Sequence, residues 1–509
     1  MKNFALILSL FALSLSAAAQ RANLLRGPYL QAATSNSIVV RWRTDVLIRG
    51  QVRFGTSPDR LDRTVRDSTL VSEHKVKLTG LTPSTRYYYS IGSYRDTLQS
   101  GNYFETPPTP GAEGLYRIAA VGDCGNNSIN QRGVRDALVK YLGDNYLNAW
   151  ILLGDNSYGS GRDAEFQSNF FNIYKETLLP KYPLYPSPGN HDYGDADSAK
   201  ELVRKSHEIS YYQNFTMPVD GEAGGLASHH KEWYSYDYGN IHFLSLDSYG
   251  IEEEKYLMSD TLGPQVEWVK QDLAANKNKG WVIAYWHHPP YTMGSHNSDN
   301  SDDLVAIREN FIRILERNGV DLILCGHSHD YERSKLMKGH FGMEPTFNPS
   351  VHLVNASSGL YDGSANSCPY LKDSASGYTG TVYVVAGSAG QLGGKQTSWP
   401  HDALPYADAT HGGCGMLEVQ GNRLDWKWVC ADGEIRDHFT YLKNTNVRRT
   451  LTVKKGKPLT LTASFTGEYQ WSNGATTRTI TINPRSSRTY TVKDRQNCLK
   501  DVYTVKIIK

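Results

Sequence analysis

The sequence predicts a layered α/β core, with β-sheets packed between helices, and an all-β sandwich on either side of it. Three observations lead to this fold class. Apolar residues alternate in short runs over residues 20–108, strand-like runs alternate with helical spacing over 112–445, and plain alternation returns over 447–509. The chain has 509 residues, 39% of them hydrophobic, which is enough for about three domains with packed cores.

The first 19 residues have the three parts of an export signal. A lysine gives the start a positive charge, residues 4–15 are mostly apolar, and three alanines precede Gln20. A buried N-terminal helix is the competing interpretation. We expect residues 1–19 to be a signal peptide and the protein to be secreted or periplasmic, with the cell surface as an alternative location.

Bulk charge, hydropathy and cysteine content disfavour several classes of protein and one class of metal site. Lys plus Arg number 54 and Asp plus Glu number 52, so no global field favours nucleic acid or a membrane surface. No later apolar run reaches the roughly 18 residues that a transmembrane segment needs, so none is expected. Six cysteines without CxxC spacing disfavour a cysteine-rich zinc site and leave the disulfide pairing open.

The N-terminal region consists of short strand-like runs with turn residues between them. These runs cover residues 38–42, 51–54, 75–78 and 86–91. Several short strands at regular spacing indicate a small sandwich. The stretch LTGLTPSTRYYYSI resembles the fibronectin type III pattern, which implies a fibronectin III-like domain over residues 20–108.

Between residues 112 and 445 the hydrophobic period changes. Helical spacing appears between apolar strand runs, which cover residues 116–121, 149–153, 241–246, 281–285 and 320–324. Polar motifs follow several of these runs directly. Because open α/β sheets form their sites at the carboxyl ends of strands, the pattern places these motifs on one rim of the core.

In the last region, residues 447–509, apolar and polar residues alternate regularly, and Asn473 with Gly474 is a hairpin signal. Its stretch YQWSNGATTRTITI resembles immunoglobulin-like modules of bacterial exported proteins. The resemblance implies a binding or spacer module without chemistry of its own, in contact with a surface or a polysaccharide. A role of the tail in secretion or surface sorting is the alternative.

Five short motifs in the central region carry potential metal ligands. They are GDCG at 122–125, GDNSY at 154–158, GNHD at 189–192, WHHP at 286–289 and GHSH at 326–329. Together they supply seven candidate ligands: Asp123, Asp155, Tyr158, Asn190, His287, His327 and His329. Seven donors exceed what one ion readily takes, but two ions that share a bridging carboxylate can use them all. We expect Asp155 to be that bridge.

The donor types narrow the choice of metals. A free phenol has a pKa near 10, so Tyr158 is a poor ligand unless a hard trivalent cation holds it as phenolate. Fe(III) is therefore the expected ion at that site, and a packing role is the competing interpretation of Tyr158. Mixed nitrogen and oxygen donors at the second site suit a divalent ion, namely Zn, Mn or Fe(II).

The series GDCG, GDNSY, GNHD, HHPPY and GHSHDYER resembles the purple acid phosphatases, within the calcineurin-like metallophosphoesterases. The fibronectin-like region before it matches the arrangement of the plant-type members. The resemblance implies a metallophosphoesterase core with a dinuclear centre and Asp155 shared between the ions. The implied ligands are Asp123, Asp155, Tyr158 and His329 for Fe(III), and Asp155, Asn190, His287 and His327 for the divalent ion.

The same resemblance implies an acid phosphatase that hydrolyses phosphate monoesters. Two cations would neutralise the phosphate and activate a metal-bound hydroxide for in-line attack. The family places outer-sphere histidines at the positions of His191 and His296, which makes them candidates for the acid that protonates the leaving oxygen, although the spacing to His296 departs slightly from the plant pattern. The partner is then a small phosphorylated substrate, and no nucleic acid is a specific partner.

Two other functions are open alternatives. A phosphodiesterase or nucleotidase of the same superfamily would use the same metals with a wider pocket. A surface adhesin with a decayed core is disfavoured, because all seven ligand positions are intact. Three further features have simpler interpretations: His242 and His288 as packed or outer-sphere groups, His229 and His230 as a solvated pair, and the glycine-rich stretch 387–394 as a tight turn beside the site.

Overall fold

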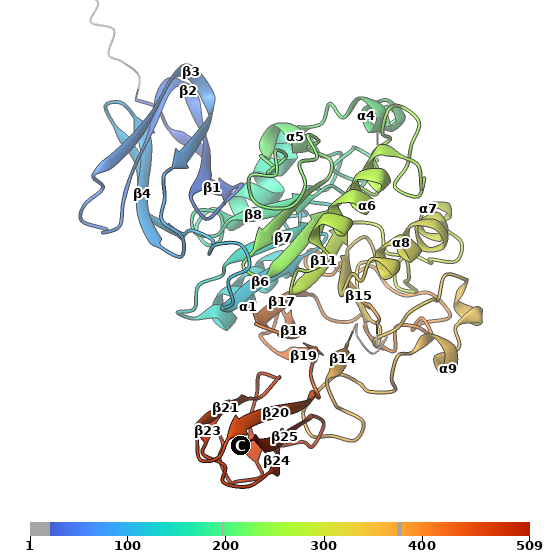
Figure 1. The fold of residues 1–509 in the computed structure, drawn as a ribbon. Helices are drawn as coiled ribbons and strands as arrows, with labels where there is room; N and C mark the ends of the chain where they lie inside the picture. Colours follow the sequence, from blue (N-terminus) through green and yellow to red (C-terminus); the bar gives the residue numbers. More distant parts are fainter. Residues whose placement is uncertain (1–20, 196, 374–378, 509) are drawn as a thin grey trace, which may run out of the picture.

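The computed structural model describes residues 21–195, 197–373 and 379–508. Figure 1 shows an N-terminal β region and a C-terminal β module at different sides of a large α/β core. The expected signal peptide, residues 1–19, lies outside the described residues. Among the helices that the structure describes, none is both long enough and apolar enough to cross a membrane.

The N-terminal region is all-β. Its strands are β1 (Leu24–Gln31), β2 (Ser37–Gly55), β3 (Arg63–Thr79), β4 (Arg86–Ser93) and β5 (Thr97–Glu105). The long strand β2 pairs antiparallel with β1, β3 and β4 and contributes Trp42 and Phe54 to a buried core. β1 also pairs in parallel with a strand of the α/β core, so the N-terminal strands and the core form one continuous hydrogen-bonded sheet.

The first core sheet continues from that junction. It contains β8 (Leu184–Ser187), β7 (Ala149–Leu153), β6 (Leu115–Val121), β17 (Gly413–Gln420), β18 (Arg423–Cys430), β19 (Ile435–Lys443) and β14 (Tyr370–Lys372). Strands β6, β7 and β8 are parallel to one another. Their carboxyl ends therefore lie at one edge, where the first three motifs follow.

The second core sheet also has a parallel centre. Its order is β16 (Tyr406–Asp408), β13 (Tyr331–Arg333), β15 (Val382–Ala386), β12 (Leu322–Cys325), β11 (Trp281–Trp286), β10 (Ile241–Ser245) and β9 (Tyr234–Tyr238). Ile151 of the first sheet and Ile283 of the second belong to the same buried cluster, so the two sheets pack against each other. Neighbouring positions such as Ala284 belong instead to the cluster shared with helices on the outer face.

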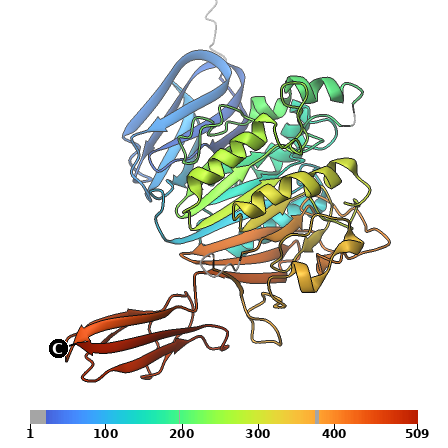
Figure 2. The ribbon, with the colours of Figure 1, turned by 45° about the vertical axis from the view of Figure 1, so that its right-hand side comes forward.

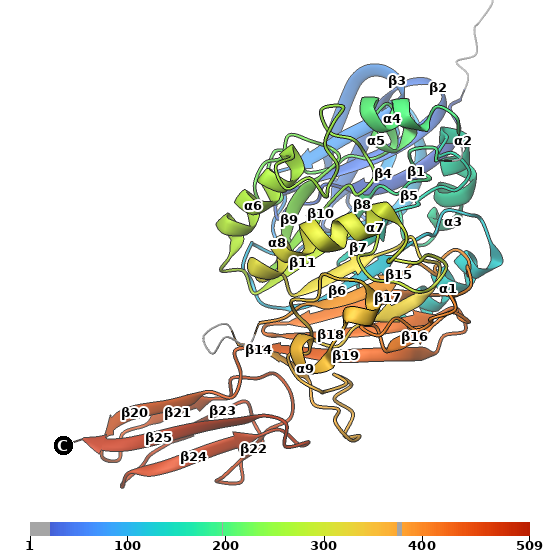
Figure 3. The same ribbon diagram turned by 90° about the vertical axis from the view of Figure 1, so that its right-hand side faces the viewer.

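Helices cover the outside of this pair of sheets (Figure 3). The second sheet is covered by α6 (Pro264–Asn276), α7 (Asp302–Ala306), the π-helical segment η2 (Ile307–Phe311) and α8 (Ile312–Arg317), whereas α1 (Ile129–Leu142) packs on the first sheet. The shorter segments are α2 (Asp163–Glu165), η1 (Phe166–Phe171), α3 (Asn172–Tyr174), α4 (Lys200–Ser206), α5 (Ser210–Asn214), η3 (Glu344–Thr346) and α9 (Pro349–His352). The predicted fold class, a layered α/β core with β regions at both ends, is confirmed.

The C-terminal module projects from the core (Figure 2). Its strands are β20 (Arg448–Lys454), β21 (Leu459–Thr462), β22 (Gln470–Trp471), β23 (Thr479–Ile482), β24 (Arg488–Lys493) and β25 (Lys500–Ile508). They form one sheet in the order β20-β25-β24-β22 and a second of β21 and β23, around a hydrophobic cluster that also includes Leu442 of β19. A disulfide between Cys368 and Cys498 joins the module to a core loop, and the other four cysteines are buried and free.

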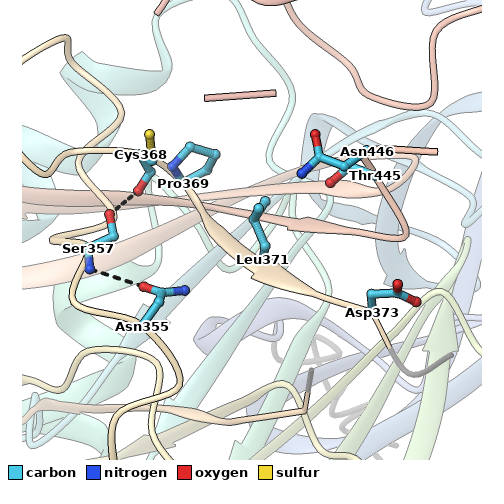
Figure 4. Close-up of a pocket in the computed structure, with 8 residues that line it drawn as sticks. All are labelled: Asn355, Ser357, Cys368, Pro369, Leu371, Asp373, Thr445 and Asn446. Carbon is cyan, nitrogen blue, oxygen red and sulfur yellow. Dashed lines mark hydrogen bonds between the residues drawn. The ribbon is translucent and has the colours of Figure 1, made fainter. Parts of the chain in front are cut away.

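A cavity of about 490 Å³ lies where the core meets the module (Figure 4). Its lining includes Ser357 and Leu371 from the core and Thr445 and Asn446 from the connection to the module. None of the seven candidate ligands lines it, so it is separate from the candidate metal centre.

Candidate metal centre

Three of the candidate ligands have an unusual backbone conformation. Asp123, Asp155 and His327 follow the ends of β6, β7 and β12 with φ angles of 56°, 49° and 68°. Non-glycine residues rarely adopt this left-handed region, and they cluster at functional sites when the surroundings hold them there. Each strand therefore ends in a sharp turn that presents a donor side chain at the same rim.

Glycines before these ligands let the turns approach closely. Gly154 has a φ of 86°, and a Cβ there would lie 2.4 Å from Nδ1 of His287. A Cβ on Gly326 would lie 2.3 Å from Oδ2 of Asp123. The glycine that precedes the ligand in the GDNSY and GHSH motifs thus makes room for a ligand from another motif.

A buried group of Asp123, Asp155 and His287 forms the centre of the site. One donor atom from each lies within 4.8 Å of the others. Nε2 of His287 is 3.3 Å from Oδ2 of Asp155 and 3.0 Å from Oδ1 of Asn190. Nδ1 of the same ring donates to the carbonyl of Leu153 at 2.8 Å, which leaves Nε2 as the atom that can bind a cation.

The remaining donors surround this group. The Tyr158 hydroxyl lies 3.0 Å from Oδ1 of Asp123 and 2.8 Å from Nε2 of His329. His327 donates its backbone N–H to both carboxylate oxygens of Asp123, and its Nδ1 is 3.2 Å from Nε2 of His287. The structure therefore brings all seven predicted ligands into one cluster, with Tyr158 and His329 on one side and Asn190 and His327 on the other.

The charge balance of this cluster fits a cation site. Among the described residues, the ion-pair partners of Asp123 and Asp155 are histidines, not lysines or arginines. Burial disfavours a charged His287, but the Asp155 and Asp123 carboxylates outweigh it and raise its pKa to about 9. The protonated His287 ring supplies positive charge beside the two carboxylates, where a bound cation would supply it instead. The oxygen and nitrogen donors around it are those that iron, zinc and manganese accept.

Two family models match the chain. The purple acid phosphatase N-terminal domain matches residues 27–106, and the calcineurin-like phosphoesterase model matches residues 116–331, which contain all seven candidate ligands. In both matched regions the chain resembles the purple acid phosphatases. Both matches end before the C-terminal module.

Curated relatives from plants and animals agree with this family. The chain is 25% identical to purple acid phosphatase 21 of Arabidopsis thaliana, covering 79% of this chain and 80% of the relative. It is 26% identical to acid phosphatase type 7 of Homo sapiens, with coverage of 70% and 75%. Against purple acid phosphatase 15 of Arabidopsis thaliana the identity is 27%, and the chain spans 57% of that protein's length.

Solved structures share the fold at low sequence identity. A purple acid phosphatase from yellow lupin seeds superimposes with a TM-score of 0.63 and 18% identity, covering 82% of this chain and 74% of the lupin chain. A structure of PhoD gives a TM-score of 0.56 and 14% identity, with coverage of 82% and 90%.

Both candidate acids, His191 and His296, lie against the ligand cluster. His191 donates its backbone N–H to Oδ1 of Asp155, and its Nδ1 is 3.0 Å from the carbonyl oxygen of Gly159. The ring of His296 stacks on that of His327, with centroids 3.8 Å apart. Both side chains are partly exposed, so a substrate could reach them.

The loop that carries His296 is fixed by buried polar groups behind it. The backbone N–H of His296 lies 3.4 Å from Oγ of Ser328, and Met293 donates its N–H to Glu332 at 3.1 Å. Thr292 and Ser328 hydrogen-bond to each other through their hydroxyls. The GHSH motif and the strand after it thus support the candidate acid as well as two candidate ligands.

Two contacts at the site have no strong signal in the sequence. Asp192 is buried, and its carboxylate accepts N–H groups from Asn156, Ser157 and Gly189, which ties the GDNSY turn to the GNHD turn. Gln391 places its side-chain amide 3.3 Å from Nδ1 of His329. The glycine-rich composition of 387–394 predicts a turn here, but it does not identify Gln391 as the contact.

The other histidines have the positions expected of packed or outer-sphere groups. His288 contacts the ring of His327 and hydrogen-bonds to Ser248. His242 is buried between Asp237 and Asp272, away from the cluster. His229 is exposed and pairs with Asp220.

Proposed function

We propose that this chain is an exported acid phosphatase that hydrolyses phosphate monoesters at a dinuclear centre of Fe(III) and a divalent ion, either Zn, Mn or Fe(II). The observation that carries the proposal is the convergence of seven oxygen and nitrogen donors, two of which are the buried carboxylates of Asp123 and Asp155. Asp123, Asp155, Tyr158 and His329 would hold Fe(III), and Asp155, Asn190, His287 and His327 would hold the divalent ion. When bound, the two ions neutralise phosphate charge and lower the pKa of a coordinated water.

The residues of the chain would then bind, orient and protonate the substrate. His191 and His296 flank the cluster and can donate a proton to the leaving oxygen, because an imidazolium is an effective donor at mildly acidic pH. The hydrogen bond from Nδ1 of His191 to the Gly159 carbonyl leaves Nε2 as the atom that exchanges the proton.

Export and the domain limits are part of the same proposal. We assign residues 1–19 to a signal peptide, 20–108 to the N-terminal domain, 112–445 to the metallophosphoesterase domain and 447–509 to the C-terminal module. The disulfide between Cys368 and Cys498 supports export, because such bonds persist in oxidising compartments. The module contributes none of the seven ligands, which supports a role in surface contact.

The test combines metal analysis with a substrate comparison. Purified protein is expected to contain iron and a second metal and to hydrolyse p-nitrophenyl phosphate faster than its bis-ester. Tyr158→Phe is expected to lose any visible phenolate–iron band while keeping Asp155 in place. Faster hydrolysis of the bis-ester would favour the phosphodiesterase alternative, and an active protein without iron would refute the Fe(III) assignment.

A further inference from the structure

The C-terminal module differs sharply in charge from the rest of the chain. Residues 447–509 contain 13 Lys and Arg against three Asp and Glu, a net charge of +10, whereas residues 1–446 contain 41 and 49, a net charge of −8. Two of the three acids, Asp494 and Asp501, are buried and accept hydrogen bonds from backbone inside the module. Glu468 is its one exposed acid, so the described surface of the module is almost entirely of one sign.

Five of these cations lie on one face of the four-stranded sheet. Successive residues of a strand point to opposite faces, and Leu451 and Tyr503 point into the module's core. Register then fixes which residues share the outer face, since Arg448 pairs with Val502 and Lys493 with Lys500. This cationic face consists of Arg448, Lys454, Lys493, Lys500 and Lys506, and it contains no described acidic residue.

The cations occupy the two ends of this face, with hydroxyl groups between them. Arg448, Lys493 and Lys500 form one end, and Lys454 and Lys506 form the other. Arg448 and Lys454 are six residues apart on β20, which corresponds to about 20 Å along a strand. Apart from Val502, the positions between the two ends are threonines on three adjacent strands: Thr450, Thr452, Thr489, Thr491 and Thr504.

The stability of the module does not account for this arrangement. None of the five cations forms an ion pair with a described carboxylate, and only Lys493 makes a side-chain hydrogen bond, at 3.4 Å to Asn497. Lys493 and Lys500 lie directly opposite each other, and like charges in that position destabilise a sheet. Charges that oppose folding and remain unpaired indicate a binding surface.

We propose that the cationic face binds an anionic polysaccharide, a hydroxylated polymer with carboxylate, sulfate or phosphate groups. The two charged ends would hold anionic groups of an extended chain, and the threonine hydroxyls would hydrogen-bond to sugar hydroxyls between them. The inference rests on the surface-contact role proposed for the module, and it is independent of the hydrolytic chemistry.

The same face has few of the features that nucleic acids and membrane surfaces require of a binding site. The aromatic residues Phe465, Trp471, Tyr490 and Tyr503 are at most 8% exposed and face the core of the module, and the partly buried Tyr469 packs against Phe465. Single-stranded nucleic acid binds on exposed aromatic rings, and a membrane surface is entered by exposed aromatic and large apolar residues. Val502 and Ile508 are apolar members of the face, but its cations and threonine hydroxyls outnumber them, and this composition fits a polysaccharide better than either.

The test measures binding of the full mature chain to polygalacturonate and to neutral dextran at low and moderate salt. We expect binding to polygalacturonate that weakens as salt increases, and none to dextran. Replacing the five cations of the face with glutamine (R448Q, K454Q, K493Q, K500Q, K506Q) is expected to weaken binding at least tenfold. A matched variant with the same charge change outside the face (K455Q, K457Q, R478Q, R485Q, R495Q) is expected to lose less than threefold.

Several outcomes would overturn the proposal. Equal losses in the two five-residue variants would show that net charge, not the face, is responsible. Tighter binding to vesicles with anionic lipid or to single-stranded DNA would assign a different partner. T450V/T504V keeps every charge and is expected to weaken binding severalfold, so an unchanged affinity would refute the polysaccharide. Turnover of p-nitrophenyl phosphate, expected to be equal in all variants, reports separately on the proposed phosphatase.

Discussion

The two β regions at the ends of this chain are attached to the core in different ways. The N-terminal region shares a hydrogen-bonded sheet with the core through β1 and β8, and its buried Arg26 bonds to Gln167, Asn214 and Asp163 of the core. The C-terminal module has its own two sheets, and its hydrophobic cluster extends to Leu442 of the core. One disulfide, the chain connection and a few hydrogen bonds, such as that from the Tyr361 hydroxyl to Asp494, tie it to the rest.

This difference divides the molecule into two parts: the N-terminal region together with the α/β core, and the C-terminal module. Shared strands and buried polar contacts make the N-terminal region and the core one cooperative unit. The module shares no strand with the core and has the opposite net charge, so it can contact a partner without disturbing the candidate metal centre. Four predictions test this division.

The largest effect is expected from the centre itself. Asp155→Asn should reduce kcat for p-nitrophenyl phosphate by roughly 10³-fold or more, because the shared carboxylate holds both ions. Removal of residues 447–509, combined with Cys368→Ser, should leave kcat within about twofold of the full chain, since the module supplies no candidate ligand. Comparable losses of kcat in the two variants would show that the C-terminal module is needed for catalysis and would contradict this division.

The next effect tests whether the N-terminal region and the core unfold together. Arg26 is 2% exposed and its guanidinium lies 4.1 Å from the ring centroid of Phe171. Arg26→Ala should destabilise both parts by about 3–5 kcal/mol, because it leaves the buried Asn214 without its charged partner and removes one of the two arginines that pair with Asp163. Calorimetry should show one shared transition at a lower temperature. Arg53→Ala, on the same region and exposed, is the control and should change little.

A smaller effect is expected at the other junction. Cys368 and Cys498 are 130 residues apart, so their disulfide restricts a long loop of the unfolded chain. Cys368→Ser with Cys498→Ser should lower the stability of the module by about 2–4 kcal/mol. The transition of the core should stay in place. If the melting temperatures of the module and the core both fell, the two would unfold as one cooperative unit, contrary to this division.

The smallest effect is a difference in pH dependence. Burial lowers the pKa of His74, in the N-terminal region, to about 4 from its ordinary 6.5. The fold thus favours neutral His74, and its contribution to stability is complete above about pH 6.5 and is lost as the pH falls towards 4. The module has no histidine, so its transition should lack this slope.

The measurement is the melting temperature of each transition between pH 7 and 4. His74→Phe keeps an aromatic ring against Trp42 and removes the titrating group, so it should flatten the slope of the shared transition. An unchanged slope in this variant would assign the pH dependence to other groups.

Local sequence patterns were enough to predict the order of strands and helices and to identify the candidate ligands. A ligand such as Asp123 or Asp155 follows an apolar strand run directly, and parallel strands end at a common edge, so the sequence could place these residues together. Tyr158 and Asn190 lie in turns that the same motifs define. The assignment of metals to these ligands stays a prediction, as does the role of His191 and His296.

Other features depended on contacts between distant segments. Gln391 reaches His329 across 62 residues of sequence, and the disulfide of Cys368 selects Cys498 from several cysteines. The pairing of β1 with β8 is equally non-local. No periodicity in the sequence records such contacts, because periodicity reports which face of an element is buried and not what covers it.

The sequence alone determined the fold class, the five motifs and the excess of positive charge in residues 447–509, since composition and local spacing carry these directly. Only the tertiary structure decided which donors contact one another, such as Nε2 of His287 and Oδ1 of Asn190, and that five cations share one face of a sheet. The physical reason is that strand register and sheet order are set by packing between segments far apart in the chain, and these decide which side chains become neighbours.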